Sequence, residues 1–490
     1  MSMDLLKDKS LFRQAAFING QWVEQTAHGK YALRNPATGE VLVELPVCRE
    51  AETEFAIESA HEAFQRWSKV TAKQRAEIVN RWYQLVVEHK EDLATLITLE
   101  EGKPLAEARG EIDYAASFLQ WFSEEAKRVR GDVIPAPKDS QRIVALKQPI
   151  GVCAAITPWN FPAAMITRKA GPALAAGCSM VVKPASQTPL TALALAELAQ
   201  RAGVPTGVFS VVTGNATRPV GNVLTGHPLV RKITFTGSTE VGRVLLAQSA
   251  ETIKKCSMEL GGNAPLIVFE DADLDLAVEG ILNAKFRNTG QSCIAANRVL
   301  IQDGIYEQLA ARLAARAAEL KVGNGLEAGV QIGPMIDEAA VGKVEEHLQN
   351  AVAGGARVLA GGRRHALGGA FFEPTVVADV ALGMTIAREE TFGPVMPLLR
   401  FRDEAEAIAM ANDTDFGLAA YLFSKDAARI WRTAEALETG MVGINTGLIS
   451  SEVAPFGGIK QSGLGREGSH YGIDEFLEIK YLCWDGVTPV

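Results

Sequence analysis

The chain has 490 residues, of which 47% are hydrophobic and 22% charged, and its formal net charge is −9. This length predicts two or three domains with large cores, and the composition excludes disordered, fibrous and coiled-coil proteins. Because no basic cluster is present, neither nucleic acid nor an anionic membrane is an expected partner. The six cysteines form no C-x-x-C pair. That spacing argues against a disulfide framework or a structural zinc site, and it favours a reducing, cytoplasmic setting.

The N-terminal segment is expected to combine short strands with helices. Asn19-Gly20 separates two short apolar stretches, which predicts a two-residue hairpin. Thr71 is expected to cap a helix that carries Ile78, Trp82 and Leu85 on one face. No cleaved secretory signal is expected, because residues 1–12 carry several charges and no apolar run.

Two further stretches need an interpretation before the motifs are considered. The uncharged run Gln148 to Thr167 is long enough for a membrane span, but it contains three prolines, so we interpret it as strand, loop and helix start. Residues 128–149 predict an extended ribbon, which is either an arm for subunit contact or a plain surface hairpin. The tail, Tyr471 to Val490, predicts a final strand whose candidate partner is this ribbon.

From Val152 onward, short apolar strands alternate with helical patterns, which predicts a parallel sheet covered on both faces. In such sheets ligands bind beyond the carboxyl ends of the strands, so residues 157–162, 183–189 and 236–242 are the candidates for function. The expected strands are 152–156, 179–182, 208–212 and 232–235, with helices at 163–176, 190–202 and 240–250. A second α/β segment follows Glu259, with strands near 266–269, 299–301 and 441–444 and helices at 274–286, 306–320 and 427–437.

Two glycine-rich motifs resemble nucleotide-binding loops. Residues 463–468 match G-x-G-x-x-G, but too little chain follows for the strand–helix unit that this motif needs, so we interpret them as a flexible loop. Residues 237–243 lack the Lys-Ser/Thr ending of a phosphate loop. They nevertheless follow a strand and open a helix, so they are either a phosphate-binding helix start or a simple capped turn.

One cysteine and one glutamate stand in contexts that suit chemistry. Cys293 follows five polar or small residues, 288–292, which is unusual for a packed thiol, although a buried inert cysteine is the common case. Glu259 ends an extended segment just before Gly261-Gly262, where backbones can approach closely. It is the best local candidate for a general base, and a surface glutamate at a strand end is the alternative.

Six ordered motifs together resemble the signature set of the NAD(P)-dependent aldehyde dehydrogenases, across essentially the whole chain. The match is closest to the succinate-semialdehyde dehydrogenase branch, which residues 163–177, 183–189 and 453–471 resemble almost throughout. The motifs are Thr157-Pro158-Trp159-Asn160-Phe161-Pro162, Lys183-Pro184-Ala185, Phe235-Thr236-Gly237-Ser238, Glu259-Leu260-Gly261-Gly262, Gly290-Gln291-Ser292-Cys293 and Glu390-Thr391-Phe392-Gly393-Pro394.

The resemblance implies a mechanism for three residues. Cys293 would attack the aldehyde as a thiolate, and the oxyanion would be held by the Asn160 side chain and the Cys293 backbone N–H. Hydride transfer would leave a thioester, and Glu259 would activate the water that releases a free acid. A coenzyme-A-acylating relative would not need such a base.

The resemblance also implies cofactor and substrate residues. Ser186 stands where members that prefer NAD often carry glutamate, so NADP is expected to be used well and NAD also. Arg168, Arg287 and Ser450 match the positions that bind the distal carboxylate of the substrate. Taken alone, Arg168 would be interpreted as a surface arginine and Arg287 as a helix C-terminal cation. The cofactor-binding candidates are Ile156, Thr157, Pro158, Trp159, Lys183, Ser186, Gly237, Ser238, Glu390 and Phe392.

The expected fold is α/β, with a Rossmann-type doubly wound parallel sheet for the cofactor, a second α/β catalytic domain and a small β oligomerisation arm. We expect residues 1–127 and 148–258 to form the cofactor domain, 259–465 the catalytic domain, and 128–147 with 466–490 the arm and tail. By analogy with the family, a homodimer or homotetramer is expected, and no metal. The sequence Cys293-Ile294-Ala295 lacks the second cysteine with which some members of the branch close a disulfide.

The sequence leaves other functions open. A glutarate-semialdehyde dehydrogenase, whose substrate is one methylene longer, and a broad-specificity aldehyde dehydrogenase are the enzymatic alternatives. A non-catalytic relative with a binding or structural role is a further one, although intact Asn160, Glu259 and Cys293 argue against it.

Overall fold

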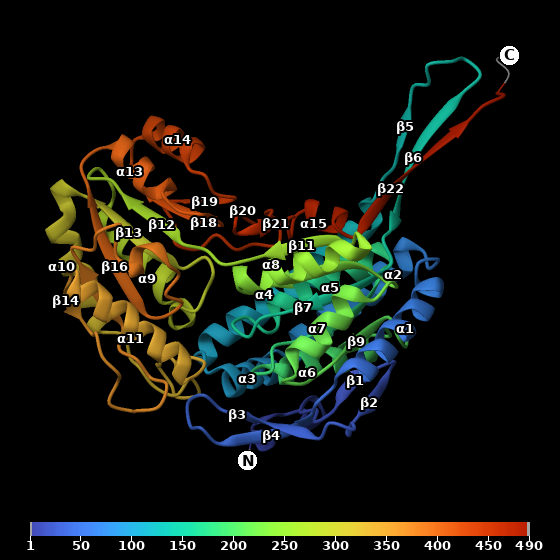
Figure 1. Cartoon of the computed structure of the whole chain (residues 1–490), viewed down its shortest axis with the longest axis horizontal. Helices are drawn as coiled ribbons and strands as arrows, with labels where there is room; N and C mark the ends of the chain where they lie inside the picture. The colour runs from blue at the N-terminus through green and yellow to red at the C-terminus, as the bar shows by residue number, and fades with distance from the viewer. Residues whose placement is uncertain (1, 488–490) are drawn as a thin grey trace.

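The computed structural model describes residues 2–487, which form two α/β bodies and a projecting arm (Figure 1). In the described chain the larger sheet has the strand order β2-β1-β9-β8-β7-β10-β11-β21. Its central strands run parallel, as the alternating pattern predicted. They are β7 (Val152–Ile156), β8 (Ser179–Lys183), β9 (Phe209–Val211), β10 (Val230–Thr236) and β11 (Lys255–Glu259), and the antiparallel edges are β1 (Ala16–Ile18), β2 (Gln21–Val23) and β21 (Gly463–Leu464).

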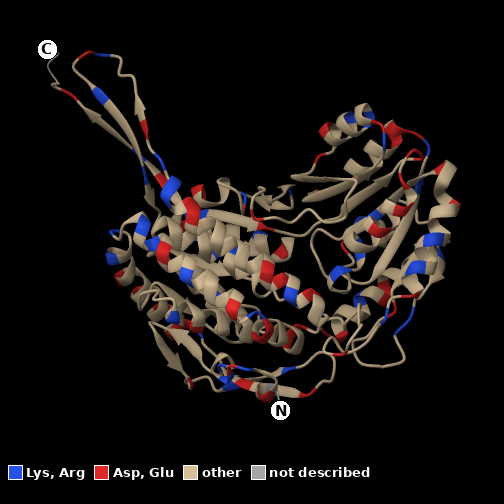
Figure 2. Ribbon diagram, turned by 180° about the vertical axis from the view of Figure 1, so that it is seen from behind, with Lys and Arg blue, Asp and Glu red and all other residues tan. Residues whose placement is uncertain are grey.

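Helices cover both faces of this sheet, so its central strands are almost wholly buried. In Figure 2 the helices carry many of the blue and red segments, whereas the sheet strands are mostly tan. The hairpin predicted at Asn19-Gly20 joins β1 to β2, and both residues have positive φ. The helices are α1 (Glu50–Trp67), α2 (Ala72–Glu88), α3 (Lys90–Glu101), α4 (Leu105–Glu125), α5 (Ala164–Ala176), α6 (Pro189–Arg201), α7 (Thr217–Gly226) and α8 (Thr239–Ser249).

The second sheet has the order β14-β15-β16-β13-β12-β18-β19 in the described residues. All neighbouring strands are parallel except the β14–β15 pair. The strands are β12 (Ala264–Val268), β13 (Ala296–Gln302), β14 (Arg357–Ala360), β15 (Thr375–Ala378), β16 (Val395–Phe401), β18 (Ala419–Phe423) and β19 (Met441–Ile444). The main helices are α9 (Leu274–Phe286), α10 (Tyr306–Ala318), α11 (Glu338–Ala353), α13 (Glu404–Asn412) and α14 (Ala427–Ala436).

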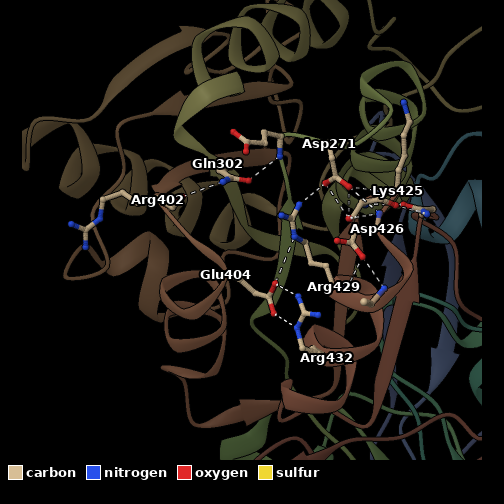
Figure 3. Close-up of polar contacts among 12 residues, drawn as sticks. Asp271, Gln302, Arg402, Glu404, Lys425, Asp426, Arg429 and Arg432 are labelled. Atoms are coloured by element: carbon tan, nitrogen blue, oxygen red, sulfur yellow. Dashed lines mark hydrogen bonds and ion pairs between the residues drawn. The ribbon is translucent and has the colours of Figure 1, made fainter.

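A polar cluster ties α13 and α14 to the end of β12. Figure 3 shows Arg429 of α14 between Asp271 and Glu404, which lie on the loop after β12 and at the start of α13. Asp271 also accepts hydrogen bonds from the backbone N–H groups of Lys425 and Asp426, and thereby fixes the start of α14. The cluster is therefore structural, and it lies outside the cavity described below.

The ribbon and the tail form the arm, a sheet of order β22-β6-β5 in the described residues. Strand β22 (Leu477–Trp484) pairs antiparallel with β6 (Arg142–Pro149), which pairs with β5 (Asp132–Ile134). The predicted pairing of tail and ribbon is therefore confirmed. Several apolar side chains are exposed on the arm, including Val133 at 84% and Trp484 at 73%.

Two local predictions, the helix after Thr71 and the run 148–167, agree with the structure. Trp82 is buried, Ile78 and Leu85 pack against the same core, and Val79 and Val86 complete this face of α2. Thr71 does cap α2, accepting from the N–H of Gln74. The run 148–167 forms the end of β6, β7 and the start of α5. No helix in the described residues is long and apolar enough to cross a membrane. The proposed domain boundaries stay a prediction.

The interpretation of residues 463–468 as a flexible loop was wrong. Gly463-Leu464 forms β21, which pairs with Met258 and Glu259 at the end of β11. A Cβ at Gly463 would lie 1.8 Å from the carbonyl oxygen of Met258, so only glycine allows this approach. The segment is a close-packed edge of the sheet, and it brings Glu467 into the interior.

Candidate active site

Cys293 lies on the segment that joins α9 to β13. This segment begins with an unusual turn in which Asn288, Thr289 and Gly290 all have positive φ, at 52°, 56° and 75°. Asparagine and glycine adopt this conformation readily, whereas the β-branched Thr289 is strained in it by about 1 kcal/mol or more. Such strain persists only where the surroundings hold it. Here Thr289 is fully buried and its hydroxyl donates to the carbonyl oxygen of Gly333.

Glycines bring the end of β11 against the cysteine. A Cβ at Gly262 would lie 2.3 Å from the carbonyl oxygen of Cys293, and one at Gly457 would lie 2.9 Å from Oε1 of Glu259. Any other residue at either position would push the two segments apart. The close backbone approach expected from Gly261-Gly262 is therefore present.

Asn160 lies on the loop that follows β7, beyond the carboxyl end of the parallel sheet. Its side-chain Nδ2 donates to the carbonyl oxygen of Gln291 at 3.0 Å, which ties the loop to the cysteine segment. Asn160 and Cys293 line one cavity of about 270 Å³. The structure thus places an amide donor and a thiol on the walls of the same cavity.

The protonation states of this site are shifted by burial. Burial raises the pKa of Cys293 to about 12, with the nearby Glu390 acting in the same direction. Burial also raises the pKa of Glu259 well above its usual value, and the carboxylate of Glu467 adds to this. The Cys293 thiol is therefore protonated near pH 7. Oε2 of Glu259 is buried without a hydrogen-bond partner, which leaves an acceptor open to a water or a substrate.

Glu467 is shared by two buried cations. Its Oε2 lies 2.5 Å from Arg168 and its Oε1 lies 2.7 Å from Nζ of Lys169. Arg168 is 1% exposed, so its interpretation as a surface arginine does not hold. Two cations on one carboxylate leave a positive charge in the interior, and buried charges are costly unless compensated. An anionic substrate group would provide that compensation.

Arg287 and Ser450 lie toward the same region. Arg287 directly follows α9, is partly buried, and holds its guanidinium 5.3 Å from the centre of the Phe161 ring. Burial raises the pKa of Tyr114, while the charges of Arg168 and Arg287 and the Ser450 side chain oppose that shift. All three candidates therefore act on one buried hydroxyl, that of Tyr114. We refer to Arg168, Arg287 and Ser450 as the carboxylate clamp.

The cofactor candidates are divided between two cavities. The cavity of Cys293 is also lined by Pro158, Trp159, Gly237, Ser238, Glu390 and Phe392. Within it, the rings of Trp159 and Phe392 meet edge to face at 5.6 Å, and Oε1 of Glu390 accepts from the N–H of Gly262 at 3.2 Å. Burial raises the pKa of Glu390 to about 7.

A second cavity of about 330 Å³ lies between α7 and α8 and is lined by Ile156, Glu240 and several apolar residues. Ser238 caps α8 by accepting from the N–H of Val241, so the capped-turn interpretation holds. The start of α8 contributes Gly237 and Ser238 to the cavity of Cys293 and Glu240 and Val241 to the second cavity. The N–H groups of a helix start bind phosphate well, so this position suits the pyrophosphate of a dinucleotide.

Three cofactor candidates line neither cavity. Thr157 follows β7 directly, and its N–H donates to the carbonyl oxygen of Lys183. Burial lowers the pKa of Lys183 to about 8, and its Nζ donates to the carbonyl oxygen of Pro184 at 2.6 Å. Ser186 is partly buried and donates to Oε1 of Gln187. All three stand at the carboxyl edge of the sheet, next to Ile156.

The sequence profile of the aldehyde dehydrogenase family matches residues 22–482. The chain belongs to the aldehyde dehydrogenase family. The fold described above is therefore that of the family, and the resemblance carried by the six motifs is confirmed.

Curated members of the family are similar over nearly the whole chain. A 3-sulfolactaldehyde dehydrogenase of Pseudomonas putida is 63% identical, over 98% of this chain and 99% of its own. A glutarate-semialdehyde dehydrogenase of Pseudomonas aeruginosa is 62% identical, over 98% and 100%. An NADP⁺-dependent succinate-semialdehyde dehydrogenase of Escherichia coli is 61% identical, over 98% and 99%. All three are named for aldehydes that carry a second, anionic group.

Sequence reasoning missed several residues that the structure brings to this site. Glu467 lay within the G-x-G-x-x-G match, and no local pattern marked it as buried. Tyr114 looked like an ordinary position of a helix, and its sequence context contains no signal. Lys343 lines the cavity of Cys293 and donates to the carbonyl oxygen of Glu390 at 2.7 Å. These three residues belong to the site through contacts with distant parts of the chain.

Proposed function

We propose that this aldehyde dehydrogenase oxidises succinic semialdehyde to succinate with NADP⁺ or NAD⁺. The observation that carries the substrate is the carboxylate clamp beside the cavity of Cys293 and Asn160. Two guanidinium groups and a hydroxyl there act together on the buried hydroxyl of Tyr114. Arginine is the residue best suited to a bidentate carboxylate. The clamp lies close enough to the thiol that the charge of Arg168 lowers the pKa of Cys293, which suits a short substrate.

The first half of the reaction forms a thioester. The Cys293 thiolate adds to the aldehyde carbon, and the carbonyl oxygen becomes an oxyanion held by the Asn160 amide and the Cys293 N–H. Each such donor contributes about 3 kcal/mol to the transition state. A bound nicotinamide dinucleotide would supply the acceptor for the hydride that leaves this carbon. The ligand-free thiol is protonated at pH 7, so activation requires loss of its proton as the site is filled.

The second half hydrolyses the thioester. Glu259, whose charge acts on the pKa of Cys293, has an unpartnered carboxylate oxygen, which can accept a proton from water. The water attacks the thioester carbon, the sulfur leaves as a thiolate, and succinate is released. Because burial raises the pKa of Glu259, its carboxylate is a stronger base than an exposed one. This step gives a free acid.

We assign the dinucleotide to the two cavities on either side of the start of α8. Glu390 and Lys183 would hold ribose hydroxyls, and Gly237 with Ser238 would hold the pyrophosphate at the start of α8. A Cβ at Gly237 would lie 2.4 Å from the Phe235 ring, so only glycine fits here. The absence of a side chain leaves the backbone of residue 237 accessible to a phosphate. Ser186 carries no negative charge, so a 2′-phosphate meets no repulsion there. We therefore propose that NADP⁺ is preferred over NAD⁺.

Two related substrates have support from the relatives, which are named for glutarate semialdehyde and 3-sulfolactaldehyde. One methylene changes binding by only about 0.8 kcal/mol, so the clamp alone does not separate succinic from glutaric semialdehyde. The deciding experiment measures kcat/KM for ω-carboxylate aldehydes of three to six carbons and for 3-sulfolactaldehyde, with both cofactors. Succinic semialdehyde should give the highest value. A tenfold preference for either of the others would reject the proposal.

We also propose that the protein forms dimers or tetramers through the arm. The arm exposes an apolar surface that a monomer would leave in water, including Ile479 at 73%. Strand β19 is the edge of the second sheet, and a partner's arm could pair with it. Light scattering after gel filtration should give a molar mass that is two or four times the 52.5 kDa of one chain. The variant Ile479→Asp should lower this mass towards that of a single chain. A monomeric wild-type protein would refute this.

A further inference from the structure

Lys103 is a buried lysine in the turn between α3 and α4. Its side chain and that of Glu111 are each only 1% exposed, and Nζ lies 2.5 Å from Oε2 of Glu111. Nζ also donates to the backbone carbonyl oxygen of Asn160 at 2.7 Å and lies 4.0 Å from the centre of the Phe161 ring. One ammonium group thus contacts both residues at the start of the loop that carries the proposed oxyanion donor.

The carboxylate of Glu111 extends this contact to α5. Its other oxygen accepts from the N–H of Ala163 at 2.9 Å and from that of Ala164 at 3.4 Å. These N–H groups stand at the start of α5, where a carboxylate is favourable. The ion pair therefore holds the second half of the loop, at the carbonyl of residue 160 and at the N–H groups of residues 163 and 164.

The same carbonyl oxygen is held from the cysteine segment. Nδ2 of Asn288 donates to the carbonyl oxygen of Asn160 at 3.0 Å, and the N–H of Asn288 donates to Oε2 of Glu107 at 2.7 Å. A carbonyl oxygen has two lone pairs, and Lys103 and Asn288 occupy both. Asn288 is also the first residue of the strained turn that precedes Cys293.

We propose that Lys103 is a positioning residue that fixes the side-chain amide of Asn160 relative to Cys293. The proposal rests on the role of Asn160 in the proposed function. Lys103 does not touch the substrate, and it acts only through the Asn160 peptide. Because a misplacement of about 1 Å in a catalytic donor can cost about a hundredfold in rate, loss of this anchor should weaken oxyanion binding.

Two reagents for the same sulfur test the proposal without any semialdehyde. p-Nitrophenyl acetate is attacked by Cys293 at its carbonyl, an oxyanion forms, and p-nitrophenolate leaves. Iodoacetamide is attacked at a saturated carbon, so iodide leaves and no oxyanion forms. Lys103→Met should slow the acylation by about tenfold or more, while the alkylation changes by less than about twofold. Equal losses with both reagents, or no loss with the ester, would overturn the proposal.

A double-mutant cycle tests the route through Asn160. The variant that combines Lys103→Met with Asn160→Ala should acylate as slowly as Asn160→Ala alone, because the anchor then has nothing to position. Losses that multiply would show that Lys103 acts elsewhere and would also overturn the proposal. Neither reagent carries a carboxylate, so a wrong substrate assignment would leave these results unchanged.

The chain offers a matched control for the loss of a buried lysine. Lys232 is fully buried, forms an ion pair with Glu475 at 3.4 Å and lies 5.1 Å from the Phe476 ring. Lys232→Met should therefore change both rates by a similar factor. If Lys103→Met does not fold, Asn288→Gly decides the question, because glycine keeps the positive φ of this turn and removes the second donor to the same oxygen. It should show the same selective loss of acylation, and equal loss with both reagents would refute the proposal.

Discussion

Arg168 and Glu467 form an ion pair of 2.5 Å inside the protein, although 299 positions separate them in the chain. The pair matters for catalysis because Glu467 also acts on Glu259, whose pKa it raises in addition to the effect of burial. The clamp arginine and the proposed base are thus linked through one carboxylate.

Replacing Glu467 by glutamine should lower the pKa of Glu259. The negative charge that opposes ionisation disappears, and Arg168 and Lys169 then face Glu259 without their partner. Hydrolysis of the thioester should therefore begin at lower pH than in the wild type. A pH series of single-turnover deacylation rates measures this. A pH profile of deacylation that is unchanged or shifted to higher pH would contradict the proposed coupling.

The Glu467→Gln variant should also lose about 3 kcal/mol in its free energy of unfolding, because two buried cations lose their partner.

The thiol of the ligand-free enzyme should behave as a weak acid. With the pKa of Cys293 raised to about 12, the rate of iodoacetamide alkylation should rise about tenfold per pH unit, without a plateau, between about pH 7 and pH 10. The alkylated fraction can be followed by the intact mass of the protein. A plateau below pH 9 would mean that the thiolate forms more easily than the structure implies. Arg168→Leu should slow alkylation further, because Arg168 lowers this pKa.

Arg287→Leu should impair binding of the carboxylate and leave the aldehyde chemistry intact. KM for succinic semialdehyde should rise by about tenfold to a hundredfold, in line with 1.5–3 kcal/mol for a hydrogen bond to a charged group. KM for butanal, which has no carboxylate, should change by less than about threefold. Steady-state kinetics with both aldehydes gives the comparison. Equal changes would exclude Arg287 from the clamp.

Ser186→Glu should exchange the cofactor preference. A carboxylate would repel the 2′-phosphate of NADP⁺ and could accept a hydrogen bond from the 2′-hydroxyl of NAD⁺. Fluorescence titration should show a Kd for NADP⁺ raised by about tenfold or more, with Kd for NAD⁺ unchanged or lower. A wild-type enzyme that binds NAD⁺ much more tightly than NADP⁺ would refute the role of Ser186.

Peroxide should inactivate the enzyme in a way that dithiothreitol does not fully reverse. Cys293 is followed by Ile294 and Ala295, so the neighbouring residues offer no thiol with which an oxidised sulfur could close a disulfide. The thiol would then pass to higher oxidation states, and a mass increase of two or three oxygens on its peptide would record this. Full recovery in dithiothreitol would contradict this prediction and would show that the oxidation stops at a state that a thiol can reduce.

Sequence patterns predicted those features that depend on neighbouring residues. The parallel sheet followed from short apolar strands between helices, and Met441–Ile444 and Leu274–Phe286 were predicted with the bounds that the structure has. Glu259 was marked by the two glycines that follow it. In each case a few adjacent residues contain the physical cause.

The missing features depend on residues that are remote in the chain. Lys103 contacts Asn160, which lies 57 positions further along the chain, and no pattern near either residue predicts this contact. Residues 463–468 were misread because their glycines allow close packing against β11, whereas the motif suggested a loop. Local patterns do not distinguish a glycine that is needed for its backbone flexibility from one that is needed because no side chain would fit.

The bond between Arg168 and Glu467 has a consequence for biosynthesis. Residue 467 is synthesised 299 positions after Arg168, so a growing chain already holds the strands β7 to β11 and the cysteine segment before the clamp arginine meets its partner. Closing so long a loop is also entropically costly. The clamp should therefore be completed only after the segment that carries β21 and Glu467 has been made and has docked against β11.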